Sequence, residues 1–178
     1  MRLWALVVLI AIPVFGFNYN PLLLKAQASI FPKLFMLVKE PDRMLVKKDV
    51  VFAVIHEEED FESAWQLKNM IEEQYDGSLE GYPFRIILIE YEKLDDTLEA
   101  SAVIALHSEK FIQKLAQLVI KKKIVSFVGD AVDLKEGFLF SLNLERSAVI
   151  YMNKPMIPYY GIEFSDTLYH VVRFLDAN

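Results

Sequence analysis

The sequence predicts a single α/β domain with a mainly parallel sheet flanked by helices on both faces, a C-terminal β-hairpin and a final helix. Short apolar runs rich in β-branched residues alternate with segments whose apolar residues recur at helical spacing. This alternation is typical of a parallel sheet covered by helices. The chain has 178 residues, enough for one compact domain with a sizeable core. Its composition, 54% apolar and 25% charged, is that of a globular protein.

The first predicted element of the domain is a helix that begins at Asn20-Pro21. Asparagine caps helix N-termini, and proline fits the first helical position. Apolar residues at helical spacing extend this helix to Val38 and predict one buried stripe along it. Pro32 lies within the stripe, so we expect it to kink the helix or to end its first half.

Strands and helices then alternate along the middle of the chain. Buried strands are predicted over 49–56, 82–91, 101–107 and 124–128. A helix over 61–75 follows the first strand, and a helix capped by Ser108 precedes the last. The residues expected on the inner face of the first of these helices are Phe61, Ala64, Leu67, Ile71 and Tyr75.

The pattern changes after Gly129-Asp130. Two strands over 138–144 and 148–153 are separated by only three residues, which predicts a β-hairpin. A last amphipathic helix is predicted over 165–176, capped by Ser165. Its expected buried residues are Leu168, Val171, Val172 and Leu175.

The N-terminal residues 1–16 have the layout of a secretory signal peptide. A cationic start is followed by an apolar run from Leu3 to Ile12, and Val14 and Gly16 are small residues suited to a cut before Phe17. The apolar run is shorter than the roughly 20 residues of a membrane span, with an uncleaved anchor as the alternative. We therefore expect an exported protein whose mature domain is 17–178 and does not span the membrane.

Composition and missing motifs exclude several function classes. Asp and Glu outnumber Lys and Arg 25 to 19, giving a net charge of −6, which argues against a nucleic-acid partner. The chain has no cysteine, hence no disulfide and no thiolate nucleophile or ligand. No G-x-S-x-G elbow, P-loop or G-x-G-x-x-G turn occurs. The sequence therefore predicts no enzyme activity, no catalytic residues and no cofactor.

Three polar residues follow predicted strands, and ligands of open α/β sheets collect at the carboxyl ends of the strands. His56 and His107 end two of these strands, and Asp130 follows a third. If they converge, two imidazoles and a carboxylate form a site for a metal or a small ligand. The alternative is that each residue terminates its strand and faces solvent, and we expect this second arrangement.

Two other polar features have structural explanations. His170 falls on the last predicted helix beside its apolar stripe, so we expect a partly buried histidine with a structural role. The acidic run 57–60 precedes a helix, where negative charge is favoured by the helix dipole. It lacks the alternating ligand spacing of a calcium loop, so we expect a solvated helix start.

The segment 151–160 is the best candidate for binding another protein. It is apolar and aromatic and contains two prolines, which rules out a regular helix interior or a central strand. Interfaces are enriched in methionine and aromatic side chains. The alternative is a loop packed over the core of its own domain. The candidate partner-binding residues are Met156, Ile157, Tyr159 and Tyr160.

Four stretches along the chain match a known family pattern in order and spacing. They are Lys25-Ala26 with Phe31, Phe35, Val38 and Glu40-Pro41; His107-Ser108-Glu109; Val128-Gly129-Asp130 with Gly137-Phe138; and Tyr151-Met152-Asn153 with Gly161-Ile162-Glu163-Phe164-Ser165 and Leu168. With these stretches the chain resembles the YfiR family of exported regulators, known from periplasmic inhibitors of membrane-bound diguanylate cyclases. It departs from the family at Glu40, where tryptophan is usual, and in its lack of cysteine.

The resemblance implies a non-enzymatic periplasmic regulator that tends to form homodimers. It implies that the protein binds and represses the sensor domain of an inner-membrane enzyme of cyclic di-GMP signalling. The alternative function, from the strand-end residues themselves, is a periplasmic domain that binds a small ligand or metal.

Overall fold

The structure, a computed structural model, describes residues 19–175, so the predicted signal peptide 1–16 lies outside the described residues. No helix in this described range has the length and apolar character needed to cross a bilayer. Its helices are α1 (Pro21–Phe35), η1 (Pro41–Met44), η2 (Glu58–Asp60), α2 (Phe61–Tyr75), η3 (Tyr91–Lys93), α3 (Ile112–Lys122), α4 (Ala131–Leu134), η4 (Lys154–Met156), α5 (Ile157–Tyr160) and α6 (Asp166–Val171). Its strands are β1 (Val50–His56), β2 (Ser78–Leu79), β3 (Tyr82–Glu90), β4 (Ala102–Ala105), β5 (Val125–Val128), β6 (Phe140–Leu144), β7 (Ala148–Asn153) and β8 (Val172–Leu175).

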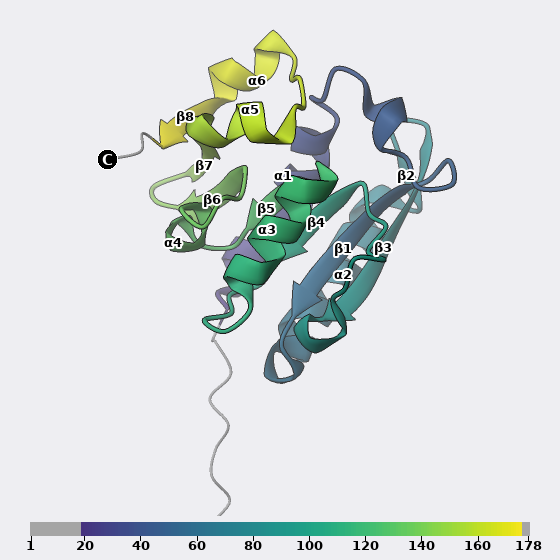
Figure 1. Cartoon of the computed structure of the whole chain (residues 1–178), viewed down its shortest axis with the longest axis vertical. Helices are drawn as coiled ribbons and strands as arrows, with labels where there is room; N and C mark the ends of the chain where they lie inside the picture. Colours follow the sequence, from purple (N-terminus) through teal and green to yellow (C-terminus); the bar gives the residue numbers. More distant parts are fainter. Residues whose placement is uncertain (1–18, 176–178) are drawn as a thin grey trace, which may run out of the picture.

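The strands form one eight-stranded sheet in the order β2-β3-β1-β4-β5-β6-β7-β8 (Figure 1). The central strands β3, β1, β4, β5 and β6 are parallel. β6 and β7 pair antiparallel with Leu144 opposite Ala148, so the predicted hairpin is confirmed. The short β2, which the sequence analysis did not predict, pairs antiparallel with β3. The mainly parallel α/β sheet is therefore confirmed.

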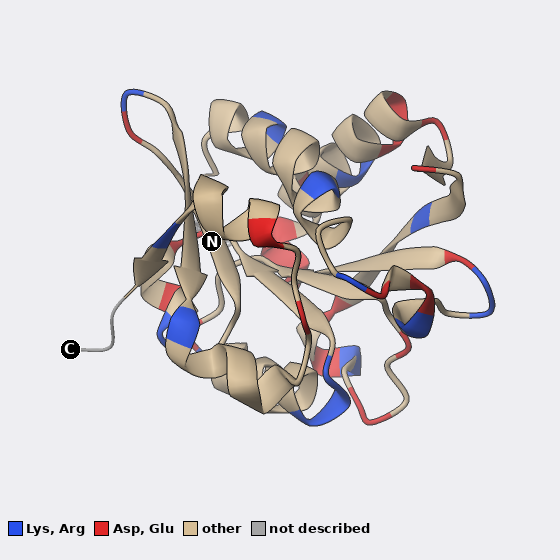
Figure 2. Ribbon diagram, turned by 90° about the horizontal axis from the view of Figure 1, so that it is seen from above, with Lys and Arg blue, Asp and Glu red and all other residues tan. Residues whose placement is uncertain are grey.

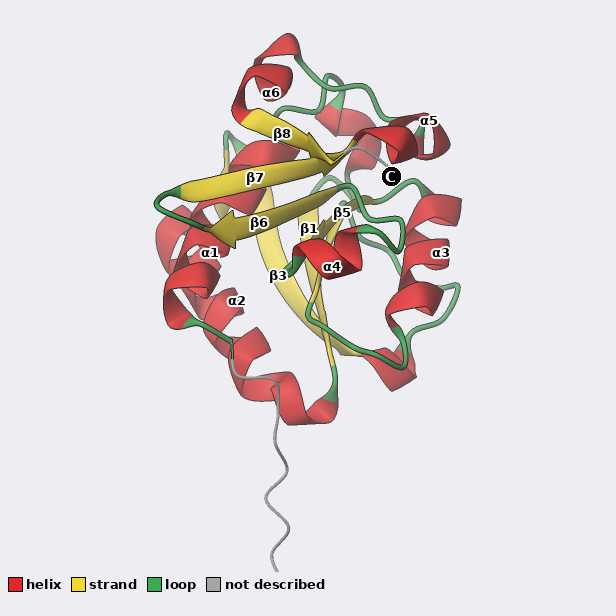
Figure 3. Cartoon of the chain, turned by 90° about the vertical axis from the view of Figure 1, so that its left-hand side faces the viewer, coloured by secondary structure: helices red, strands yellow, loops and turns green. Residues whose placement is uncertain are grey.

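Helices cover both faces of this sheet (Figure 3). α1 and α2 lie side by side on one face, where α2 contacts β1 and β3 and α1 contacts β6. α3 lies on the opposite face. The inner positions of α3, among them Leu115 and Val119, are fully buried, as their helical spacing predicted.

The core under α1 is aromatic. The ring of Phe31 stacks on that of Phe127 at a centroid distance of 4.5 Å. Phe127 in turn stacks on Phe140 at 5.4 Å, and Phe35 meets Phe52 edge to face at 5.4 Å. Every residue of β1, β4 and β5 is buried, as predicted for strands covered on both faces.

The helix α1 ends at Phe35, whereas the sequence predicted that it extends to Val38. Asn20 caps it as predicted, its side chain accepting a hydrogen bond from the backbone N–H of Leu22 at 2.9 Å. Pro32 does not end the first half, because α1 continues through it to Phe35. Residues on both sides of the proline, Phe31 and Phe35, are fully buried against the sheet. This packing holds the last turn in place although proline donates no hydrogen bond.

The predicted final helix over 165–176 is wrong in its second half. α6 ends at Val171, and Val172–Leu175 form β8, parallel to β7. Only Leu168 of the four expected buried residues is fully buried, while Val171 is 50% exposed. β-branched and aromatic residues favour extended backbone, and the outer edge of β7 offers hydrogen-bond partners to such a segment. Pairing with β7 therefore outweighs the helical spacing.

Two predicted side-chain environments are also wrong. Phe61 begins α2 as expected but is 49% exposed. His170 is exposed rather than partly buried, although it lies within α6. Charged residues of both signs are interspersed along the loops and helix ends in the view of Figure 2.

Candidate functional site

The strand order changes direction between β1 and β4. From β1 the chain passes through α2 to β3 on one side, and then to β4 on the other side of β1. Ligand sites of open α/β sheets form at such a switch point, outside the carboxyl ends of the strands. β1 ends here at His56, and β4 is followed by Leu106 and His107. Two of the three predicted strand-end residues therefore lie at the switch point.

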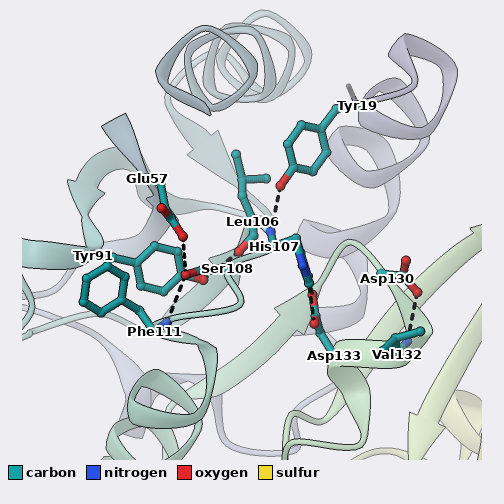
Figure 4. A network of polar contacts seen from close by, with 10 residues as sticks. All are labelled: Tyr19, Glu57, Tyr91, Leu106, His107, Ser108, Phe111, Asp130, Val132 and Asp133. Carbon is teal, nitrogen blue, oxygen red and sulfur yellow. Dashed lines mark hydrogen bonds and ion pairs between the residues drawn. The ribbon is translucent and has the colours of Figure 1, made fainter. Parts of the chain in front are cut away.

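His107 joins three distant segments of the chain at this point (Figure 4). Its backbone N–H donates a hydrogen bond to the Tyr19 hydroxyl at 2.7 Å. Its ring Nδ1 lies 2.9 and 3.0 Å from the two carboxylate oxygens of Asp133 on α4. Asp133 is only 3% exposed. The N-terminal segment and α4 are thereby tied to the end of β4.

A second group of hydrogen bonds joins the ends of β1 and β4 (Figure 4). The Ser108 hydroxyl donates a short hydrogen bond to the carboxylate of Glu57. It also accepts the backbone N–H of Phe111 at 3.0 Å, so Ser108 caps the turn that leads into α3. The hydroxyl of Tyr91 donates to the backbone carbonyl of Leu106 at 2.6 Å.

The three residues predicted as metal or small-ligand candidates have separate roles in this region. His56 is 2% exposed, and its Nδ1 lies 2.7 Å from the backbone carbonyl of Glu57. Asp130 caps α4 by accepting the backbone N–H of Val132 at 2.9 Å. His107 is paired with Asp133. Within residues 19–175 no three His, Asp or Glu side chains are grouped as metal ligands.

The expectation that each strand-end histidine faces solvent is also wrong for His56. Its ring packs edge to face on Phe61 at a centroid distance of 5.7 Å. The acidic run 57–60 is likewise solvated only in part. Glu58 and Glu59 are exposed, whereas Glu57 bonds Ser108 and Asp60 is 4% exposed.

Burial sets the protonation of the polar groups at the switch point. Burial raises the pKa of Asp133, and the hydrogen bond from His107 opposes that rise. Burial raises the pKa of Tyr19 and Tyr91 well above the ordinary tyrosine range, so both side chains are neutral phenols. The site therefore combines neutral tyrosine hydroxyls with the Glu57 carboxylate and the partly buried His107–Asp133 pair.

We expect Asp133→Asn to change how stability depends on pH. The folded protein holds the Asp133 proton more tightly than the unfolded chain, because burial raises the pKa above its ordinary 3.8. The contribution of Asp133 to stability is thus fully present below pH 3.8 and is lost as the pH rises through its raised folded-state pKa. The Asp133→Asn variant has no carboxyl group at this position, so it does not lose this contribution to stability as the pH rises.

The free energy of unfolding of Asp133→Asn, relative to the unmodified protein, should therefore increase as the pH rises from below 3.8 through the raised folded-state pKa of Asp133. Urea titrations at several pH values measure the difference. A difference that stays constant or decreases with pH would contradict the expectation.

Sequence reasoning found only part of this site. It named His107 and assigned a capping role to Ser108, but it did not connect them to Tyr19, Glu57 or Asp133. Glu57 directly follows a strand-end histidine, and Asp133 lies one helical turn after Asp130. The sequence positions of Glu57 and Asp133 could therefore have indicated that both belong to the site. The contact of Tyr19 depends on where α1 packs, which no local pattern indicates.

The predicted partner-binding residues divide between surface and core. Tyr159 is 65% exposed, whereas Met156 and Ile157 are half-buried against the core. Tyr160 is fully buried, and its hydroxyl donates to the backbone carbonyl of Gly137 at 3.0 Å. The segment holds the end of β7, which is paired on both sides, and then two short helices that accommodate Pro155 and Pro158.

No protein-family model and no curated protein sequence matches the chain. Among solved structures, a conserved domain protein from Vibrio cholerae O1 biovar eltor is similar, with a TM-score of 0.64 and 8% identity over 86% of this chain. An ABC domain in complex with L-Trp from Streptococcus pneumonia has a TM-score of 0.54 and 8% identity over 80% of this chain. The chain spans 60% of the length of each. At such identities the likeness shows the fold alone.

Proposed function

We propose that the protein is a non-enzymatic periplasmic regulator that binds and represses the sensor domain of an inner-membrane enzyme of cyclic di-GMP signalling. The class of partner rests on the resemblance to the YfiR family. The observation that supports binding to a protein is the outer edge of β8 with its exposed apolar side chains.

β8 is the last strand in the sheet order, so its outer edge pairs with no strand of the described range 19–175. An uncovered edge presents backbone N–H and C=O groups that can pair with a strand of another protein. Soluble proteins usually protect such an edge with charges or a covering element. β8 has a single charged residue, Arg173, which contacts Glu145 at 3.5 Å.

Exposed apolar side chains lie on and beside this edge. We define the C-terminal patch as Tyr169, Val171 and Phe174, which are 39%, 50% and 36% exposed. The rings of Tyr169 and Phe174 lie 6.2 Å apart, and the Lys154 ammonium lies 5.1 Å from the Phe174 ring centre. Lys154 belongs to the predicted partner-binding segment 151–160, which therefore adjoins the patch. Aromatic side chains grouped in this way are typical of binding surfaces.

Repression follows from binding if the partner has an active and an inactive state. A regulator that binds the inactive state more tightly shifts the population toward that state by the ratio of its two affinities. A shift of the partner from 99% active to 99% inactive needs a roughly ten-thousandfold preference for the inactive state. Release of the regulator then restores synthesis of cyclic di-GMP.

Crosslinking in envelopes of the native host, followed by affinity purification and mass spectrometry, tests the partner class. We expect an inner-membrane protein with a cyclic di-GMP enzyme domain among the principal partners. Deletion of the gene should raise cellular cyclic di-GMP. An unchanged cyclic di-GMP level, with no membrane signalling enzyme captured, would contradict the proposal.

The double variant Tyr169→Ala/Phe174→Ala tests the surface. We expect it to weaken the association at least tenfold, because truncated aromatic residues at interface centres have the largest effects. It should also fail to restore the low cyclic di-GMP level in the deletion strain. Leu22→Ala is the matched control, since Leu22 is also an exposed apolar residue, at 68%, but lies on α1. Equal effects of both variants would remove the C-terminal patch from the proposal.

The homodimer implied by the resemblance is part of the same proposal. Light scattering of the purified protein measures its mass directly, and a value of twice 20.6 kDa, less any cleaved signal peptide, is expected. A monomeric mass at micromolar concentration would contradict the homodimer but not the proposed class of partner.

A periplasmic small-ligand-binding domain is the second candidate function. One structure with the same fold is described in complex with L-Trp, which favours this class. Native mass spectrometry of the protein from its host would detect a bound molecule as added mass. A bound ligand that His56→Ala/His107→Ala releases from a folded protein would support the strand-end site over the regulator.

A further inference from the structure

A cavity of about 680 Å³ lies at the amino-terminal edge of the sheet, opposite the switch point. Its walls come from the segments that precede three parallel strands: 44–47 before β1, 98–100 before β4 and 122–124 before β5. The turn 160–163 after α5 and the segment 38–43 complete it. None of the strand-end residues predicted from the sequence lines this cavity.

The lining of the cavity is apolar in part and polar in part. Val38, Leu98, Ile124 and Ile162 all line it, with exposed fractions between 4% and 8%, and belong to the core. Small-molecule sites combine such an apolar lining with a few polar groups that fix orientation. The cavity therefore has room for an apolar ligand body of drug-like size.

The rim of the cavity is basic although the whole chain carries a net charge of −6. Its charged lining residues are Lys39, Glu40, Arg43, Lys47, Glu99, Lys122, Lys123 and Glu163. Two pairs neutralise each other: Lys39 with Glu163 at 3.2 Å and Arg43 with Glu40 at 2.8 Å. Glu99 is the remaining acidic residue of the lining. Three lysines of the lining form no ion pair within residues 19–175: Lys47, Lys122 and Lys123.

Two of these lysines occupy backbone conformations that disfavour any residue with a side chain. Lys47 has a φ of 53° in the tight turn between Val46 and Asp49, whose central residues are usually Asn and Gly. Lys123 has a φ of 57° at the end of α3, a position usually taken by Gly. Strained backbone of this kind concentrates at functional sites. Lysine at both positions places two ammonium groups at the same cavity.

We infer that this cavity binds a small organic anion whose charged group meets the lysines and whose apolar body fills the lining. The three unpaired lysines supply positive charge for the anionic group. Because the lining also contains apolar residues, it favours an organic anion over a purely inorganic one. This cavity lies at the opposite edge of the sheet from the switch point, and binding of an anion there is independent of the proposed protein partner.

Anilinonaphthalene sulfonate, an aromatic anion whose fluorescence rises in apolar surroundings, is a suitable probe. We expect Lys47→Asn/Lys123→Gly to weaken its binding about tenfold, since two charge-assisted contacts are lost. The same variant should melt about 2–4 °C higher, because Asn and Gly suit these conformations better. A weaker site in a more stable protein cannot result from unfolding.

Lys48→Asn is the matched control. Lys48 has a φ of 79° in the same turn but does not line the cavity, so its replacement relieves a similar strain and should leave probe affinity within twofold. N-phenylnaphthylamine, the uncharged analogue of the probe, should be insensitive to both variants. Unchanged sulfonate binding in the double variant, or equal affinity of the unmodified protein for the two probes, would overturn the inference.

Discussion

Replacement of Tyr160 by alanine is expected to lower the free energy of unfolding by about 4 kcal/mol. Tyr160 is fully buried, and its hydroxyl lies 2.7 Å from Ser126 Oγ and 3.0 Å from the carbonyl oxygen of Gly137. The alanine variant leaves a cavity and removes both hydrogen bonds. Ser126 itself accepts the backbone N–H of Leu139 at 3.0 Å, so the disturbance reaches the start of β6.

Two further variants separate the contributions. Tyr160→Phe keeps the ring and should cost about 1–2 kcal/mol, the cost of a buried hydrogen bond. Tyr159→Ala, at a side chain 65% exposed, should change stability by less than about 0.5 kcal/mol. Urea denaturation of the three variants measures these values. If Tyr160→Ala were as mild as Tyr159→Ala, Tyr160 would not be the core residue described here.

The difference in burial between Tyr159 and Tyr160 decides which variants can test partner binding by the 151–160 segment. A binding defect in a Tyr160 variant would report loss of the fold, whereas a defect in Tyr159→Ala would report loss of a surface contact. Met156 is also unsuitable for testing binding, because its replacement would disturb packing inside the domain. Its methyl carbon lies 3.6 Å from the position that a Cβ atom on Gly137 would occupy.

Gly137→Ala is the second large effect, with an expected loss of about 3 kcal/mol. Gly137 has a φ of 119°, which residues with a side chain rarely adopt. An added methyl group would also lie 3.1 Å from Ile120 Cδ1 in α3. The variant therefore combines backbone strain with a tight contact to the end of the Ile120 side chain. The strain lies at the residue whose carbonyl accepts the Tyr160 hydroxyl.

Gly77→Ala is the matched control for the strain alone. Gly77 has a φ of 70° after α2, and nothing lies within 4 Å of an added methyl group. Its replacement should cost about 1 kcal/mol. Thermal and urea unfolding of both variants gives the comparison. Equal losses at the two glycines would show that contact with Ile120 adds nothing.

The sequence predicted most elements because local chemistry is decisive for them. β-branched runs such as 49–56 can be buried on both faces only in a covered parallel strand, and β1 spans Val50–His56. The helix predicted over 61–75 has the same bounds in the structure as α2. The acidic run favours its start, and the chain leaves the helix at Asp76, whose φ is 45°. The hairpin β6–β7 followed from two strands separated by three residues.

What the sequence determined by itself is the α/β class, the order of its elements and the presence of polar residues after β1, β4 and β5. The tertiary structure decided where those residues point and with what they pair. Val172–Leu175 became a strand because β7 offered an open edge. His107 met Asp133 because α4, which packs on β5 and β6, brings Asp133 to the residue that follows Leu106. The same holds for Tyr160, whose burial depends on α5 packing beside α3. Periodicity reports which face of one element is apolar, whereas these contacts depend on free energies summed over segments far apart in the chain.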